Sequence, residues 1–237
     1  YVAQAACFKK SIGFDMGGTS TDVSRFDGRY ERRYEMEVND PESDTGVRVV
    51  APMLAIETVA AGGGSICWFD GQKPVVGPRS AGASPGPACY GRGGPLTVTD
   101  INLYLGKIIP DHFAFPLDRE VVEQRLQDLL ESIHEATGQR YSPDELASGF
   151  TAIANANMTA PIKKISIARG YDVRDYVLVS FGGAGAQHAC AIARELGIKK
   201  VLQHPYAGIL SAFGIGMSDV KKFAARDVSK AYNTSHL

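Results

Sequence analysis

A short apolar run that ends at an aspartate and enters a turn of glycines and hydroxyl residues constrains this chain most. The run Ile-Gly-Phe at 12–14 is followed by Asp-Met-Gly-Gly-Thr-Ser-Thr-Asp at 15–22. A strand that stops in such a turn leaves backbone N–H groups and three hydroxyls unpaired, which is how proteins build binding sites for phosphate oxygens. A plain polar hairpin turn is the alternative, because glycines followed by hydroxyl residues are also common in turns.

Asp15 stands at the end of the apolar run, where a carboxylate can face a phosphate-bound Mg²⁺ directly or through water. The residues that follow the turn indicate antiparallel strands. Residues 21–26 have the pattern of a second strand, Asp27-Gly28 is typical of a type I′ hairpin, and residues 29–38 alternate as a third strand. The glycine turn therefore joins two strands, which excludes a P-loop, whose glycines lead into Gly-Lys-Ser/Thr on a helix.

Composition narrows the functional class. The chain has 237 residues with 44% hydrophobic content, enough for a large core, and 25 basic against 26 acidic residues. No block of like charges stands out, which argues against a nucleic-acid or membrane-surface partner. The four cysteines have no paired spacing, and no long uninterrupted apolar span or targeting segment is present. We expect a soluble cytoplasmic protein with reduced thiols and small-molecule or protein partners.

A second hairpin and a long irregular segment follow the first strands. Residues 65–69 and 72–76 are expected to pair across Asp70-Gly71. Residues 77–94 then contain six glycines and three prolines. A compact domain keeps so long an irregular segment chiefly where the segment lines a site, and a flexible linker is the alternative.

The remainder divides into a helical region, residues 97–170, and a βαβα unit, residues 171–225. Thr99 or Asp100 can cap the first helix, and the box Ser-Pro-Asp-Glu at 142–145 begins a long buried one. The predicted elements of the βαβα unit are strands at 176–181 and 199–203 and helices at 189–196 and 208–222. Together with a β-meander and Gly/Pro loop at 11–96, this order predicts an α/β fold. We expect the ribonuclease-H-like half of an actin/Hsp70/sugar-kinase-type ATPase with a helical insertion.

A second glycine turn, Gly182-Gly183-Ala184-Gly185, follows a predicted strand. It differs from a dinucleotide fingerprint, because His188 occupies the third glycine position and the next strand ends without an acidic residue for a ribose. The glycines instead suit a close approach of backbone to the flat face of a base or ribose, at the start of a helix. We therefore expect this turn to bind a nucleoside.

Five segments taken together resemble the hydantoinase A/oxoprolinase family. They are residues 15–23, 60–65, 76–90, 97–100 and 180–190. The likeness runs from about residue 12 to residue 220 and is greatest to the ATP-dependent 5-oxoprolinases. The resemblance implies an actin/Hsp70-type fold and phosphorylation of a cyclic amide oxygen by ATP, after which water opens the ring and 5-oxoproline becomes glutamate.

The resemblance also assigns roles to residues. Asp15, Gly17, Gly18, Thr19 and Thr21 match a phosphate loop of the family, and Gly182, Gly183 and Gly185 match its adenosine loop. Asp15 and Asp22 are the catalytic candidates. Asp15, Asp100 and His188 are the metal candidates, although Asp100 also suits a helix cap and His188 a structural hydrogen bond. ATP and Mg²⁺ are the expected cofactors.

The family has another phosphate loop in an upstream segment, and this sequence contains no second Asp-x-Gly-Gly-Thr. We therefore expect the chain to fold alone but to be inactive without an upstream half of the ATPase domain and a hydantoinase B-type domain or subunit. A homo-oligomer is a further candidate assembly. A hydantoin or a ketone is the alternative substrate, and a nucleotide-switched binding module like actin or Hsp70 is the alternative of a different class.

Overall fold

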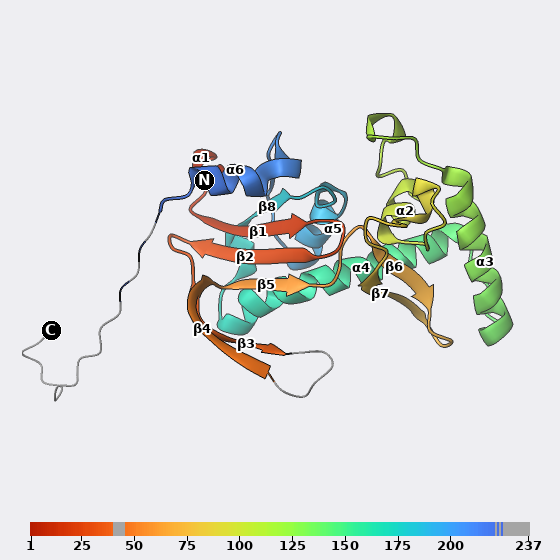
Figure 1. Ribbon diagram of the computed structural model, residues 1–237, viewed down its shortest axis with the longest axis horizontal. Helices are drawn as coiled ribbons and strands as arrows, with labels where there is room; N and C mark the ends of the chain where they lie inside the picture. Colours follow the sequence, from red (N-terminus) through yellow and green to blue (C-terminus); the bar gives the residue numbers. More distant parts are fainter. Residues whose placement is uncertain (40–45, 221, 223, 225–237) are drawn as a thin grey trace, which may run out of the picture.

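Strand β1 (Lys10–Met16) lies at the centre of a five-stranded mixed sheet in the computed structural model, which describes residues 1–39, 46–220, 222 and 224 (Figure 1). The strand order is β5-β2-β1-β8-β9. The other members are β2 (Thr21–Asp27), β5 (Ile56–Val59), β8 (Val177–Phe181) and β9 (Val201–Gln203). Strand β2 runs antiparallel to β1 and β5, whereas β8 runs parallel to β1 and β9. This is the ribonuclease-H-like arrangement that the sequence predicts.

Alternation along β1 gives the sheet two different faces. Ile12, Phe14 and Met16 are fully buried and pack in the main core beneath α4 (Pro143–Ile165) and α5 (Ala186–Leu196). The opposite face carries Asp15, which is half-buried. Short helices α1 (Val2–Ala5) and α6 (Leu210–Met217) lie on that side (Figure 1). On β1, Asp15 therefore lies on the less covered face of the sheet.

A second lobe lies beside the sheet and shares its core. It contains the hairpin of β6 (Ser65–Phe69) and β7 (Pro74–Ser80) together with η1 (Ala88–Tyr90), α2 (Val98–Tyr104), η2 (Pro110–His112) and α3 (Arg119–Thr137). Helix α4 runs from this lobe to the sheet, as Figure 1 shows. Phe150 of α4 and Leu126 of α3 belong to the same hydrophobic cluster as Phe14 of β1. One continuous core thus joins the two lobes.

The third strand predicted at residues 29–38 does not join the central sheet. Strand β3 (Arg32–Asn39) pairs instead with β4 (Gly46–Leu54) in a separate two-stranded ribbon, and β5 takes the place beside β2. A polar–apolar alternation indicates a strand but not its partner, which explains the error. The ribbon is attached through Glu57 of β5, which forms ion pairs with Arg33 of β3 and, at 2.8 Å, with Lys164 of α4.

Several element boundaries also differ from expectation. The Gly/Pro-rich segment begins within β7 and contains the buried η1, so it is a folded loop and not a linker. The N-cap of α2 is Thr97, with Asp100 at the third helical position. Helix α6 ends at Met217, before the predicted residue 222. The division at residues 96/97 and 170/171 stays a prediction, and residue 225 lies outside the described residues.

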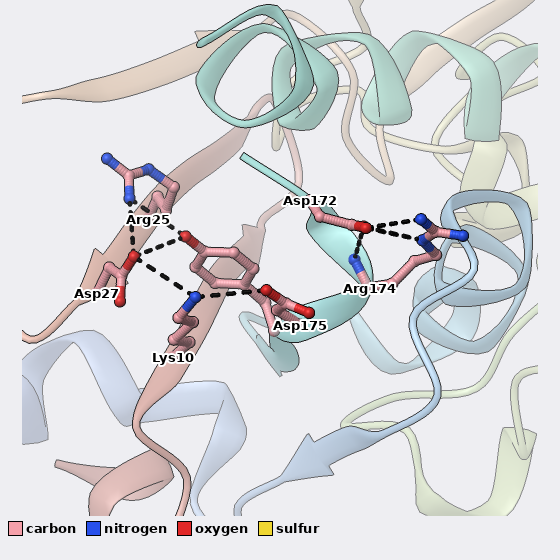
Figure 2. A network of polar contacts seen from close by, with 7 residues as sticks. Lys10, Arg25, Asp27, Asp172, Arg174 and Asp175 are labelled. Atoms are coloured by element: carbon pink, nitrogen blue, oxygen red, sulfur yellow. Dashed lines mark hydrogen bonds and ion pairs between the residues drawn. The ribbon is translucent and has the colours of Figure 1, made fainter. Parts of the chain in front are cut away.

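A network of hydrogen bonds and ion pairs lies at the end of the sheet where β1 begins (Figure 2). The Tyr176 hydroxyl donates to Asp27 Oδ2 at 3.1 Å and accepts from Arg25 Nη1 at 3.3 Å. Lys10 Nζ forms ion pairs with Asp175 at 3.4 Å and with Asp27 at 3.9 Å. Because Lys10 begins β1 and Tyr176 directly precedes β8, these contacts fix the alignment of the two parallel strands. They lie away from the glycine turn at the other end of β1.

The segments around β8 complete the chain. Between α4 and β8 lie the short helices η3 (Ile167–Arg169) and η4 (Val173–Asp175), and η5 (Ala207–Ile209) precedes α6. Asp172 and Arg174 form a separate surface ion pair, visible in Figure 2, in which the hydrogen bonds from Arg174 lower the pKa of Asp172 to about 2. Within the described residues, no helix is long and apolar enough to cross a membrane.

The interior of α4 generates a stability prediction. A methyl group added at Gly149 would meet nothing within 4 Å beyond its own helix. We expect Gly149→Ala to stabilise the 237-residue chain by about 0.5–1 kcal/mol, because alanine restricts the unfolded chain and suits a helix interior. Urea unfolding measures this change.

Gly185→Ala provides the matched control for Gly149→Ala. The added methyl group at Gly185 would collide with the carbonyl oxygen of Phe181 and lie 2.8 Å from Ser180 Oγ, so this variant should be destabilised. A lower unfolding midpoint for Gly149→Ala would contradict the packing described for α4.

Candidate functional site

Three glycine turns meet at the end of β1. The first, residues 17–20, joins β1 to β2, the second is Gly62–Gly64 between β5 and β6, and the third is Gly182–Gly185 between β8 and α5. The N–H of Gly63 donates to Gly17 O at 3.0 Å, and the N–H of Ala184 donates to Met16 O at 3.0 Å. The structure therefore brings the two predicted turns together and adds a third that was not predicted to take part.

The Gly62–Gly64 turn supports the first turn through close backbone contact. A Cβ on Gly62 would lie 2.7 Å from the carbonyl carbon of Thr19 and 2.8 Å from Gly17 O. The N–H of Gly64 also donates to Gly18 O at 2.5 Å. Only glycine permits this approach. Sequence reasoning missed this role, although three consecutive glycines between two strands are its signal.

Thr21 also supports the turn and does not line it. The residue is fully buried, and its hydroxyl donates to Ala61 O at 2.5 Å. Gly182 and Gly185 serve packing too: a Cβ on Gly182 would lie 2.5 Å from Asp15 Oδ1, and one on Gly185 would collide with Phe181 O. The expectation of direct ligand contact is corrected for Thr21, because its hydroxyl already has a partner inside the chain.

Gly17, Gly18 and Gly183 behave differently, because the chain itself gives no reason for glycine there. A Cβ on Gly18 or Gly183 would meet nothing within 4 Å, and one on Gly17 would meet only Ser20 O at 3.8 Å. None of the three has a positive φ. No hydrogen bond joins the N–H of Gly18 or Thr19 to another described group. Bare backbone with free N–H groups therefore faces open space, as an anion-binding turn requires.

Asp15 and Asp22 face each other across β1 and β2. They occupy opposite positions in the register, so both side chains lie on the same face of the sheet. Asp15 Oδ2 accepts a hydrogen bond from Ser211 Oγ at 2.7 Å, and Asp22 Oδ1 accepts one from Thr58 Oγ1 at 2.6 Å. Neither acid forms an ion pair with a described residue. Two neighbouring carboxylates without a basic partner fit a hard divalent cation such as Mg²⁺.

Asp100 is not available as a metal ligand. Its carboxylate is fully buried and accepts hydrogen bonds from Ala88 N at 3.0 Å, Cys89 N at 2.8 Å, and the N–H and hydroxyl of Thr97 at 2.7 and 2.8 Å. Four donors occupy both oxygens, so Asp100 binds the Gly/Pro-rich loop to the start of α2. Burial, assisted by the Asp100 charge, raises the pKa of the Cys89 thiol, which argues against a thiolate nucleophile.

His188 is likewise committed to hydrogen bonds within the chain. Its Nδ1 lies 2.8 Å from Asn155 Oδ1, and its Nε2 lies 2.8 Å from Asn102 Nδ2. Burial, with the nearby charge of Lys107, lowers the pKa of His188 to about 3, so the ring is neutral. Nδ1 donates and Nε2 accepts, which leaves no free ring nitrogen for a metal ion.

Asp100 and His188 are therefore not supported as metal ligands, because hydrogen bonds within the chain already occupy both side chains. Across the described part of the chain, no group of three or more His, Cys, Asp and Glu side chains is arranged to hold a metal ion. Mg²⁺ bound to nucleotide phosphates needs only one or two protein carboxylates. Asp15 and Asp22 remain the fitting pair for such an ion.

Comparison with known proteins places this geometry in a family. The Hydantoinase/oxoprolinase family model matches residues 1–223. The 5-oxoprolinase PfmaA of Pestalotiopsis fici is 50% identical over an alignment of 218 residues, which covers 89% of this chain and 16% of that protein. The chain thus spans less than a fifth of the length of this curated relative.

Solved structures show the same fold. The crystal structure of ATP-dependent caprolactamase from Pseudomonas jessenii is 38% identical with a TM-score of 0.74, covering 92% of this chain and 31% of that one. A nucleotide-free acetone carboxylase is 27% identical with a TM-score of 0.76, covering 92% and 30%.

These likenesses confirm the predicted actin/Hsp70-like ATPase fold. The resemblance inferred from the five sequence segments is confirmed as well, because the family model covers nearly the whole chain. The chain belongs to the hydantoinase/oxoprolinase family.

Proposed function

We propose that this chain is the nucleotide-binding part of an ATP-dependent enzyme that hydrolyses a cyclic amide, with 5-oxoproline as the substrate. The observation that carries the proposal is the open backbone of Gly17, Gly18 and Gly183 around Asp15, which no packing within the chain explains. Relatives support the reaction class, because one is named a 5-oxoprolinase and another an ATP-dependent caprolactamase.

Each turn has a separate task in this proposal. The free N–H groups of Gly18 and Thr19 bind phosphate oxygens, and the exposed backbone at Gly183 lies against the base or ribose. Asp15 and Asp22 hold Mg²⁺. Gly62–Gly64 and Thr21 keep the first turn in place, and Gly182 and Gly185 allow the third turn to approach β1 closely.

The chemistry follows from this placement. When bound, ATP would supply a phosphoryl group to the amide carbonyl oxygen, which would activate the carbonyl carbon for attack by water. The residues of this chain orient the anionic oxygens and offset their charge before reaction, which is the largest protein contribution in phosphoryl transfer.

We further propose a cytoplasmic location, in keeping with four unpaired cysteines.

Substrate identity is tested by release of ADP from the full-length protein. Turnover that depends on 5-oxoproline, and not on hydantoin, caprolactam or acetone, supports the proposal. Dependence on hydantoin or a ketone would change the substrate and keep the ATP chemistry. ADP release that none of these compounds stimulates would favour a nucleotide-switched binding module.

We expect Asp15→Ala in the full-length protein to lower turnover by at least ~100-fold, because it removes one preorganised group that acts on charge in the transition state. Thermal stability should change little, since Asp15 is half-buried at a strand end. Asp172→Ala is the control, because Asp172 lies on the surface and, among the described residues, pairs only with Arg174. Normal oxoproline turnover by Asp15→Ala would refute the assignment.

Gly183→Val should weaken ATP binding by roughly 1–3 kcal/mol, since the new side chain would occupy space proposed for the nucleoside. The fold should tolerate it, because a Cβ there meets no atom of the chain. Calorimetry of ATP binding and thermal unfolding together measure both effects. Gly185→Val is the matched control, and we expect it to lower the thermal stability of the protein. Unchanged ATP affinity in a folded Gly183→Val protein would place the nucleotide elsewhere.

The isolated 237 residues should fold but show no oxoproline-dependent ATP hydrolysis. An actin-type ATPase holds its nucleotide between two halves, and one half alone should lose on the order of 10³-fold in affinity or rate. Adding an upstream half, and a partner domain or subunit, should restore turnover; one relative is itself a caprolactamase subunit alpha. Substrate-dependent turnover by the isolated chain would mean that the described turns are sufficient.

A further inference from the structure

Ser211 connects the C-terminal helix to the proposed metal-binding acid. It lies in the first turn of α6, and its Oγ donates to Asp15 Oδ2 at 2.7 Å across a sequence separation of 196 residues. Asp15 Oδ1 lies next to Gly182, where a Cβ would come within 2.5 Å. The carboxylate is therefore held between α6 and the third glycine turn.

The segment that carries Ser211 also holds the third turn. The N–H of Gly182 donates to the carbonyl oxygen of Ala207 at 3.0 Å, and Ala207 is buried in η5. The side chain of Phe213, two residues after Ser211, stacks on His204 with ring centroids 5.7 Å apart. Residues 207–211 thus contact both Asp15 in β1 and the backbone of the third turn.

Repulsion between Asp15 and Asp22 gives a reason for the contact between Ser211 and Asp15. Asp15 and Asp22 are directly opposed like charges, and such pairs repel. Each acid has one oxygen held by a hydroxyl group from another element, Ser211 for Asp15 and Thr58 for Asp22. A hydroxyl that donates to a carboxylate fixes its rotation and still leaves acceptor positions for a cation.

We propose that Ser211 is a positioning residue that orients the Asp15 carboxylate for Mg²⁺. The proposal rests on the proposed function, since it assumes that Asp15 binds the ion that accompanies the nucleotide. It goes further, because it assigns a role in metal binding to α6, a helix that lies outside all three glycine turns. The competing explanation is that Ser211 only anchors α6 to the sheet.

The test uses the full-length protein with Ser211→Ala, Ser211→Thr and the control Ser218→Ala. Ser218 lies just beyond α6, and its hydroxyl donates to Ile215 O at 2.8 Å. ADP binding is measured by calorimetry over a Mg²⁺ titration and again in EDTA, with thermal unfolding of each variant alongside.

Ser211→Ala should raise the Mg²⁺ concentration for half-maximal ADP binding about tenfold, the effect expected for a lost hydrogen bond to a charged group. Its ADP affinity in EDTA should match that of the wild-type protein. Ser211→Thr keeps the hydroxyl and should show the wild-type Mg²⁺ dependence of ADP binding. The control Ser218→Ala should also show the wild-type dependence. If Ser211→Ala fails to fold, the near-isosteric Ser211→Cys should show the same shift.

An unchanged Mg²⁺ dependence in folded Ser211→Ala or Ser211→Cys would overturn the positioning role, as would an equal loss of affinity in EDTA. Both results would leave the proposed function intact. Wild-type protein that binds ADP equally with and without Mg²⁺, or not at all, would instead overturn the proposed function and this inference with it.

Discussion

The close backbone contact between the second glycine turn, Gly62–Gly64, and the first turn is the constraint on which the site depends. Among the described groups, the N–H groups of Gly18 and Thr19 in the first turn have no hydrogen-bond partner, so the turn depends on support from outside. Hydrogen bonds to Gly17 O and Gly18 O hold its carbonyl groups on one side, so its N–H groups point elsewhere. A rigid anion-binding surface arises because the supporting turn contributes only glycine at the contact.

The pairing of β1 with β8 extends this constraint to the third turn. Polar contacts of Lys10 and Tyr176 align the two strands at one end, and five residue pairs carry the register to Asp15 and Phe181 at the other. The third turn therefore begins beside Asp15. A shift in this register would separate the acid from Gly182, so interactions at the far end of the sheet determine the geometry of the site.

Sequence patterns predicted the elements near the first turn well, because strand alternation and glycine turns are local signals. They failed where the outcome depended on a distant partner. The alternation at residues 29–38 did not reveal β4 as its partner. The sequence left Asp100 as either a metal ligand or a helix cap, whereas its carboxylate accepts hydrogen bonds from the loop amides of Ala88 and Cys89. His188 likewise bonds to Asn102 and Asn155, on two other helices. Such contacts follow from packing and leave no periodic signal in the chain.

The long helix α4 has a consequence for how this part of the protein unfolds. Its residues Phe150 and Met158 are buried in one cluster that reaches from α3 to the strands of the sheet. Neither lobe can expose its interior without losing contacts to the same helix. Amides in the middle of α4 should therefore exchange with solvent only through global opening, and the two lobes should melt as a single cooperative unit.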